Sequence, residues 1–247
     1  VARLNGWAWG RVAGEALQAV LLAALLRADF GRPVSASTFR PLLGFGLFMA
    51  LSLGIDRIAT TADTLYIQAF LGQSDLVGQY GAASLALQAT FLLPMAVIAL
   101  AVPRLSGLAG KADALVGFVR LHARSYAAML IVLTALLAVL GPPAVLAALG
   151  PSYAPAARLI PVLAPVLLLL GLLQGGGAVL IAFDRGDLAV VQSMAGLCLN
   201  LALNAVLLPR FGIWGAAFAA LFTMAARLVL MWFLVQYALG RARRVPG

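Results

Sequence analysis

A short stretch of the sequence, "IDRIATTADTLYIQ" at residues 55–68, gathers the side chains best suited to bind a polar ligand. It contains two carboxylates, Asp56 and Asp63, and one guanidinium, Arg57. Hydroxyl and amide side chains accompany them at Thr60, Thr61, Thr64 and Gln68. An arginine forms strong charge-assisted hydrogen bonds with anionic groups, and hydroxyl and amide groups bond to neutral polar ones. The stretch therefore predicts noncovalent binding of a polar, anionic ligand.

The charges in this stretch are conspicuous because the rest of the chain avoids charge. The 247 residues are 64% hydrophobic and only 10% charged, with a mean hydropathy of +1.04. A soluble domain has about a quarter of its residues charged. Apolar runs of about 20 residues are long enough to cross a bilayer. The composition predicts an all-α polytopic membrane protein, and the net charge of +9 does not indicate nucleic-acid binding, because most basic residues lie at the edges of apolar segments.

About seven membrane-spanning helices are expected, separated by breaks rich in glycine and proline. They cover residues 8–26, 41–71, 77–102, 125–149, 157–183, 187–208 and 213–239. A segment at about 106–124 is too polar to cross the membrane, and its pattern predicts an amphipathic helix on the cytoplasmic surface.

The distribution of arginine and lysine predicts the orientation, because these residues gather in cytoplasmic connections. Eleven lie on one side: Arg27, Arg32, Arg40, Arg104, Lys111, Arg120, Arg124, Arg185, Arg241, Arg243 and Arg244. Four lie on the other: Arg3, Arg11, Arg158 and Arg210. The C-terminus is therefore expected in the cytoplasm. Because seven spans leave the N-terminus outside and the chain starts almost directly in a helix, we expect a fragment with earlier spans missing.

Helical geometry predicts that the polar residues of 55–68 share one stripe near the middle of their span. At 100° per residue, Asp56, Thr60 and Asp63 form one line, and the adjacent line holds Arg57, Thr61, Thr64 and Gln68. A charge at this depth costs about 2.5–3.5 kcal/mol and almost always faces a bundle interior or an aqueous cavity. The alternative is an ion pair between Arg57 and Glu15, although Glu15 could instead pair with Arg11.

Arg227 is the second deep cation, either functional or satisfied by a helix–helix contact, while Asn200 and Asn204 are expected to hydrogen-bond between helices. The candidate substrate-binding residues are Arg57, Asp56, Thr60, Asp63, Thr64, Gln68 and Arg227. With one cysteine, Cys198, and one histidine, His122, we expect no metal site, no cofactor and no catalytic residue.

Four motifs in this order resemble the polysaccharide (O-antigen or exopolysaccharide) flippases of the Wzx type. These belong to the multidrug/oligosaccharidyl-lipid/polysaccharide exporter superfamily. The motifs are "ADTLYIQAFLGQSDLVGQYGAASLALQ" at 62–88, "VPRLSG" at 102–107, "LGPSYAPAARLIPVLAP" at 149–165 and "LPRFGIWGAAFAAL" at 208–221. The resemblance implies that residues 1–40 hold helix six and a cytoplasmic linker, and that 41–247 form the six-helix C-terminal lobe of a two-lobed flippase.

The resemblance implies a transporter rather than an enzyme, located in the inner (plasma) membrane. It would flip a polyprenyl-diphosphate-linked oligosaccharide by alternating access, contacting membrane lipids, the missing N-terminal lobe and a coupling H⁺ or Na⁺. Arg57 would line the cavity between the lobes. The alternatives are a cation-coupled drug exporter of the same superfamily and a non-functional half-transporter fragment. A glycosyltransferase or ligase that uses the same lipid donor would require a sizeable catalytic loop, which these short connections lack.

Overall fold

The structure is a computed structural model that describes residues 36–108 and 112–242, together with isolated positions between residues 13 and 24. The chain divides into two compact units, Val1–Gly44 and Phe45–Gly247. The first turns of helix α2 belong to the first unit, and the remainder of α2 with all later helices belongs to the second. The helix contacts and the candidate site lie within the second unit.

Every regular element of the described residues is a helix, and six helices are long and apolar enough to cross a membrane. They are α2 (Ala36–Leu71), α3 (Ser74–Gly107), α4 (Ala112–Leu149), α5 (Ala154–Ala182), α6 (Gly186–Phe211) and α7 (Ile213–Ala242), with a 3-10 turn, η1 (Pro151–Tyr153), before α5. The expected all-α polytopic fold is confirmed, and these helices correspond to six of the expected segments. The expected helix at 8–26 falls outside the described residues, apart from isolated positions.

Glycine ends α2 and α6 where the sequence predicts breaks. Gly72, with φ +62°, follows the last residue of α2, and its N–H donates to the carbonyl of Gln68 at 3.0 Å. Gly212, with φ +58°, follows α6 in the same way and donates to Leu208 at 2.8 Å. Side chains with a Cβ are strained at positive φ, so glycine is the residue that stops a helix in this conformation.

The polar segment at 106–124 differs from the separate surface helix that we expected. Its greater part forms the first turns of α4, which continues unbroken to Leu149. Its apolar side is already used within the bundle, because Leu115 is 1% exposed and packs with Leu105 and Ala178. A helix of 38 residues is about 57 Å long, against a hydrocarbon core of roughly 30 Å. One helix can therefore cross the membrane and extend into the headgroup region.

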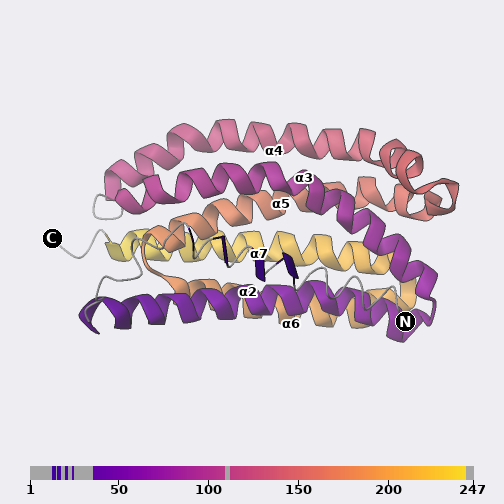
Figure 1. Ribbon diagram of the computed structural model, residues 1–247, viewed down its shortest axis with the longest axis horizontal. Coiled ribbons are helices and arrows are strands. Elements are labelled where there is room, and N and C mark those ends of the chain that lie inside the picture. The colour runs from indigo at the N-terminus through magenta and orange to yellow at the C-terminus, as the bar shows by residue number, and fades with distance from the viewer. Residues whose placement is uncertain are drawn as a thin grey trace. The chain divides into compact units, whose positions relative to one another are not determined.

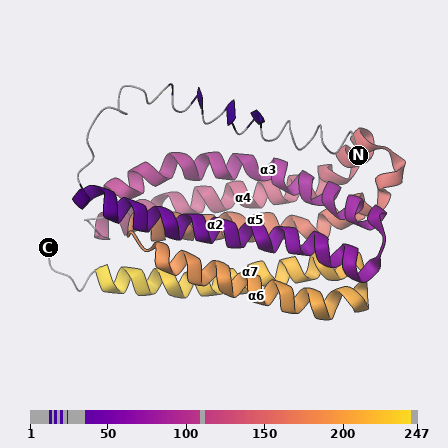
Figure 2. The ribbon, with the colours of Figure 1, turned by 60° about the horizontal axis from the view of Figure 1, so that its bottom comes forward.

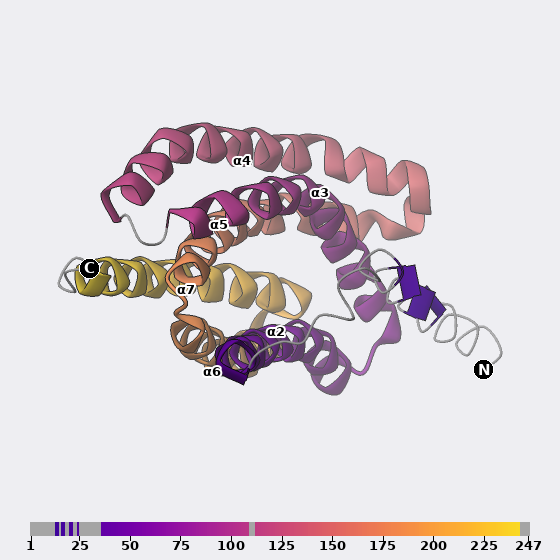
Figure 3. The same ribbon diagram turned by 60° about the vertical axis from the view of Figure 1, so that its left-hand side comes forward.

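Helix α5 is the central helix of the Phe45–Gly247 unit. In the most apolar 18-residue stretch of α5, 56% of the residues are buried, whereas the share in the corresponding stretch of each of the other five helices is 28% or less. It packs closely against α3, α4 and α7 (Figures 1 and 3). Gly171 brings α4 close, because a Cβ at this position would overlap the side chain of Leu130. Small residues of this kind let helices approach closely in membranes, where apolar packing alone gives little drive to associate.

Helix α2 is attached differently from the other helices. Close backbone approaches join α3 to α5, α4 to α5, α5 to α7 and α6 to α7, whereas α2 reaches its neighbours mainly through side chains. It runs alongside α6 (Figures 1 and 2), and only 11% of its most apolar window is buried. Much of its surface therefore remains open within the Phe45–Gly247 unit.

Candidate functional site

The polar residues of α2 lie on two different faces of the helix. Ser52 and Asp63 are buried, at 7% and 8% exposure, and Asp56 is partly buried on the same side. The exposed group, which we call the polar stripe, consists of Arg57, Thr60, Thr61, Thr64 and Gln68. At 100° per residue, Arg57, Thr61, Thr64 and Gln68 lie on average about 120° around the helix from the two aspartates, and Thr60 lies between them. The single stripe expected from the sequence is thus divided, with both aspartates on the packed side.

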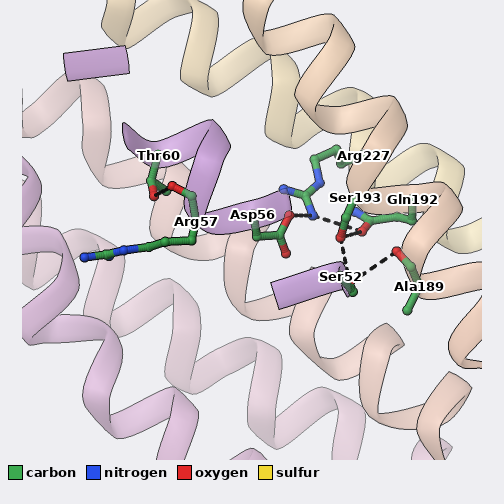
Figure 4. Close-up of polar contacts among 8 residues, drawn as sticks. All are labelled: Ser52, Asp56, Arg57, Thr60, Ala189, Gln192, Ser193 and Arg227. Atoms are coloured by element: carbon green, nitrogen blue, oxygen red, sulfur yellow. Dashed lines mark hydrogen bonds and ion pairs between the residues drawn. The ribbon is translucent and has the colours of Figure 1, made fainter. Parts of the chain in front are cut away.

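Arg57 is exposed, and its side chain has no hydrogen-bond or ion-pair partner among the described residues. It lies at the midpoint of the apolar part of α2, Leu43–Leu71. Figure 4 shows its side chain extending away from Asp56 and from α6 and α7. The alternative pairing with Glu15, and that of Glu15 with Arg11, lies outside the described residues.

Two threonines of the polar stripe bond to the backbone of Arg57, and their hydroxyl oxygens can still accept hydrogen bonds from a ligand. The hydroxyls of Thr60 and Thr61 each donate to the backbone carbonyl of Arg57 at 2.9 Å. Each oxygen therefore has its hydrogen occupied and its lone pairs available. Thr64 and Gln68 are exposed and make no side-chain hydrogen bond within the described residues. The polar stripe can thus offer one permanent positive charge and several hydrogen-bonding groups to a single ligand.

Asp56 lies on the other side of α2 and forms an ion pair with Arg227 of α7. Arg227 Nη2 donates to Asp56 Oδ1 at 2.8 Å and to Gln192 Oε1 of α6 at 2.9 Å (Figure 4). The Arg227 side chain is 6% exposed and that of Asp56 is 39% exposed. Arg227 therefore takes part in a helix–helix contact rather than in the polar stripe.

A glycine on α6 allows Arg227 to reach Asp56. A Cβ at Gly196 would lie 2.5 Å from Arg227 Cδ and 2.7 Å from Nε. Such distances are far below van der Waals contact, so any side chain at 196 would displace the arginine. One turn away, the hydroxyls of Ser52 and Ser193 are 2.8 Å apart, which joins α2 directly to α6.

Asp63 belongs to a separate buried cluster of neutral partners. Its carboxylate accepts from Asn204 Nδ2 of α6 at 2.8 Å and from the Tyr80 hydroxyl of α3 at 3.3 Å. Asn204 Nδ2 also lies 3.2 Å from Asn200 Oδ1, and Asn204 Oδ1 is buried without a partner. The expectation that Asn204 hydrogen-bonds between helices is confirmed. No cation pairs with Asp63 among the described residues.

Sequence reasoning identified Asn200 and Asn204 of α6 but missed Gln192 and Gly196, although one pattern marks all four residues. Gln192, Gly196, Asn200 and Asn204 are spaced four apart, and all are buried. A four-residue spacing places side chains along one helix face. Four small or polar residues on one face of an apolar helix thus indicate a polar helix–helix seam. Within the described part of the chain, no three His, Cys, Asp or Glu side chains cluster to hold a metal ion.

The fold and the placement of charge define a multi-pass α-helical membrane protein with ionisable residues at mid-membrane depth, an arrangement that marks substrate and ion pathways in transporters. Residues 4–158, more than half of the 247-residue chain, match the family described as polysaccharide biosynthesis protein. The chain belongs to this family, and the resemblance read from its motifs is confirmed. The match includes all of α2, α3 and α4 and the beginning of α5. Searches among curated proteins and solved structures give no match.

Proposed function

We propose that this protein flips a polyprenyl-diphosphate-linked oligosaccharide across the inner membrane by alternating access, for the synthesis of a surface polysaccharide. It acts as a transporter and not as an enzyme. Membership of the polysaccharide biosynthesis family and the six spanning helices support a role in moving a polysaccharide precursor.

The observation that carries this proposal is the exposed position of Arg57. A charged side chain at the centre of a spanning helix is too costly to face lipid tails, so it faces a cavity or another part of the protein. Arg57 is exposed at this depth, extends away from α6 and α7 (Figure 4), and has no partner among the described residues. A cavity lined by the polar stripe is therefore the simplest surrounding for α2.

In this cavity Arg57 binds the diphosphate or an acidic sugar through charge-assisted hydrogen bonds. Thr60, Thr64 and Gln68 bond to sugar hydroxyls, since they share the stripe and keep acceptors or donors free. A second lobe, corresponding to the N-terminal half of the transporter, forms the opposite wall. The C-terminus lies in the cytoplasm.

A proton or Na⁺ is the proposed coupling ion, and Asp63 is the better of the two candidate carboxylates. Asp56 is already neutralised by Arg227, while Asp63 is surrounded by neutral partners. A buried carboxylate without a cationic partner is stabilised by taking up a cation or a proton. Drug export driven by such an ion is the rival function, and it requires Asp63 but not Arg57.

Replacement of Arg57 tests the proposal. Loss of a hydrogen bond to a charged group costs about 1.5–3 kcal/mol, so Arg57→Ala should lower export about ten- to hundredfold. Arg57→Lys should retain part of the activity because it keeps the charge but not the fork of donors. The measurements are surface polysaccharide and protein abundance in cells that depend on this gene.

Two control variants accompany Arg57→Ala. One changes a neighbouring position on α2, and the other removes an exposed arginine elsewhere. Ile58→Ala shortens the neighbouring side chain, which is 58% exposed and carries no charge. Arg120→Ala removes another exposed arginine, near the start of α4. Both should export normally. Normal export by Arg57→Ala at normal abundance would refute the proposal, and altered drug resistance without a change in polysaccharide would favour the rival.

A further inference from the structure

Asp56 and Arg57 are adjacent in the sequence, so the direction of one determines the direction of the other. Consecutive side chains on a helix point about 100° apart. Figure 4 shows Asp56 directed toward Arg227 and Arg57 directed away from it. Whatever holds Asp56 in place therefore also determines where Arg57 projects.

Both apolar and polar contacts hold α2. Ile67 is fully buried in the core, and Phe48 lies against the start of α6. The backbone of α2 does not approach its neighbours as closely as those of the other helices do, and lipid tails solvate its apolar side chains as well as another helix would. Its side-chain hydrogen bonds to other helices involve Ser52, Asp56 and Asp63 within the described residues. Among these, only Asp56 meets a full opposite charge.

The surroundings of Arg227 hold its guanidinium in one place. Gly196 leaves space for the side chain to cross α6, and Gln192 accepts a second hydrogen bond from the same nitrogen that donates to Asp56. The Arg227 side chain is only 6% exposed, so water does not compete strongly for its hydrogen bonds. An arginine held in this way acts as a fixed point against which α2 is oriented.

We propose that Arg227 is a positioning residue, which sets the rotation of α2 through Asp56 and so directs Arg57 toward the open side of the helix. The consequence for transport rests on the proposed function of Arg57. The rotation itself does not, because it can be measured without any substrate.

Disulfide cross-linking between α2 and α6 measures this rotation. The Ser52 and Ser193 hydroxyl oxygens are 2.8 Å apart, so cysteines at both positions should cross-link readily in the full chain in native membranes. Cys198, which is free, is replaced by alanine beforehand. Adding Arg227→Ala should lower the rate of cross-linking at least severalfold, and so should Asp56→Ala.

A second cysteine pair, away from α2, controls for the folding of the bundle. A Cβ at Gly176 of α5 would lie 2.5 Å from Met231 Cγ of α7, so cysteines at 176 and 231 should also cross-link. This pair should react at the same rate with and without Arg227→Ala. The double variant Asp56→Arg with Arg227→Asp restores the opposite charges in exchanged positions and should recover most of the 52–193 cross-linking.

Three results would overturn the proposal: an unchanged 52–193 rate in Arg227→Ala, an equal fall at the 176–231 pair, or no recovery in the exchanged pair. The first shows that α2 does not depend on Arg227, the second that the whole bundle is affected, and the third that the ion pair is not responsible. If the rate depends on Arg227 while Arg57→Ala exports normally, the positioning role stands and the proposed function of Arg57 fails.

Discussion

Asp56 and Asp63 are two turns apart on the packed side of α2, yet they meet different partners. Asp56 faces the guanidinium of Arg227, which neutralises it. Asp63 meets an amide of Asn204 and the hydroxyl of Tyr80, and neither carries a charge. A paired carboxylate keeps its charge in a buried place, whereas an unpaired one needs an added cation or proton. The two residues therefore have different expected roles, structural for Asp56 and ion exchange for Asp63.

Asp63→Asn separates the charge of this residue from its hydrogen bonds. The amide oxygen still accepts from Asn204, so protein abundance should stay normal. Export should fall on the order of tenfold, which corresponds to about 1.4 kcal/mol in the transport barrier, because the side chain no longer exchanges a cation. The measurement is surface polysaccharide at matched abundance, together with its dependence on the proton and sodium gradients.

Asp187→Asn is the matched control, since it makes the same chemical change at a carboxylate that already has a cationic partner. Arg185 donates two hydrogen bonds to Asp187, at 2.7 and 2.8 Å, in the connection between α5 and α6. These bonds raise the pKa of the Arg185 guanidinium above its ordinary value, so it remains charged. Export by Asp187→Asn should be normal. Equal losses in both variants, or none in Asp63→Asn, would contradict the coupling role.

At the level of elements, α5 and α2 are held by different kinds of contact. Helix α5 is packed closely on several sides, and Gly171 lies directly against Leu130 of α4. Helix α2 is more open and is held by a few polar contacts together with buried apolar side chains such as Ile67. Close packing resists any change of position, whereas a few polar contacts can be exchanged for others. We therefore expect α5 to determine stability and α2 to be the helix most sensitive to single polar substitutions.

Substitution of glycines on α5 tests the packing of this helix. Gly171→Val must displace Leu130 and should lower the free energy of unfolding by about 1–3 kcal/mol, the usual cost of overpacking. Gly177→Val makes the same change on the same helix, but a Cβ at 177 meets nothing within 4 Å. It should be far less destabilising. Thermal unfolding of both variants in detergent gives the comparison, and equal losses would show that α5 is not closely packed at Gly171.

For the molecule as a whole, the alternation of six spanning helices places the arginine-rich connections on one side. The α3–α4 and α5–α6 connections and the end of α7 share that side, because successive spans run in opposite directions. Arg104 near the end of α3, Arg120 and Arg124 in the first turns of α4, and Arg185 between α5 and α6 lie at these ends. Basic residues near the ends of spanning helices favour the cytoplasmic side.

A reporter fusion at the C-terminus tests this orientation. An alkaline phosphatase fused after residue 247 should be inactive, because this enzyme needs the oxidising periplasm to form its disulfides. The same reporter inserted at Gly212, between α6 and α7, should be active. The reverse pattern would place the C-terminus outside the cytoplasm and contradict the predicted orientation.

Most of the fold can be predicted from the sequence, because its causes are local. The length of each apolar run sets the spanning helices, and glycines such as Gly72 and Gly212 end α2 and α6 through their own backbone conformation. The boundary that failed lies at 106–124, where Leu115 packs against α5 and the polar residues simply continue α4. That contact joins segments far apart in the sequence, so no local pattern reveals it.

The sequence by itself determined that this is a polytopic helical membrane protein of a polysaccharide biosynthesis family, with three charged residues in the middle of the span that contains residues 55–68. Only the tertiary structure decided which of those charges are paired. Arg57 and Asp56 differ by a single position, but Arg227, which receives Asp56, is 171 residues away. The rotation of a helix depends on partners across space, and periodicity within the helix does not specify them.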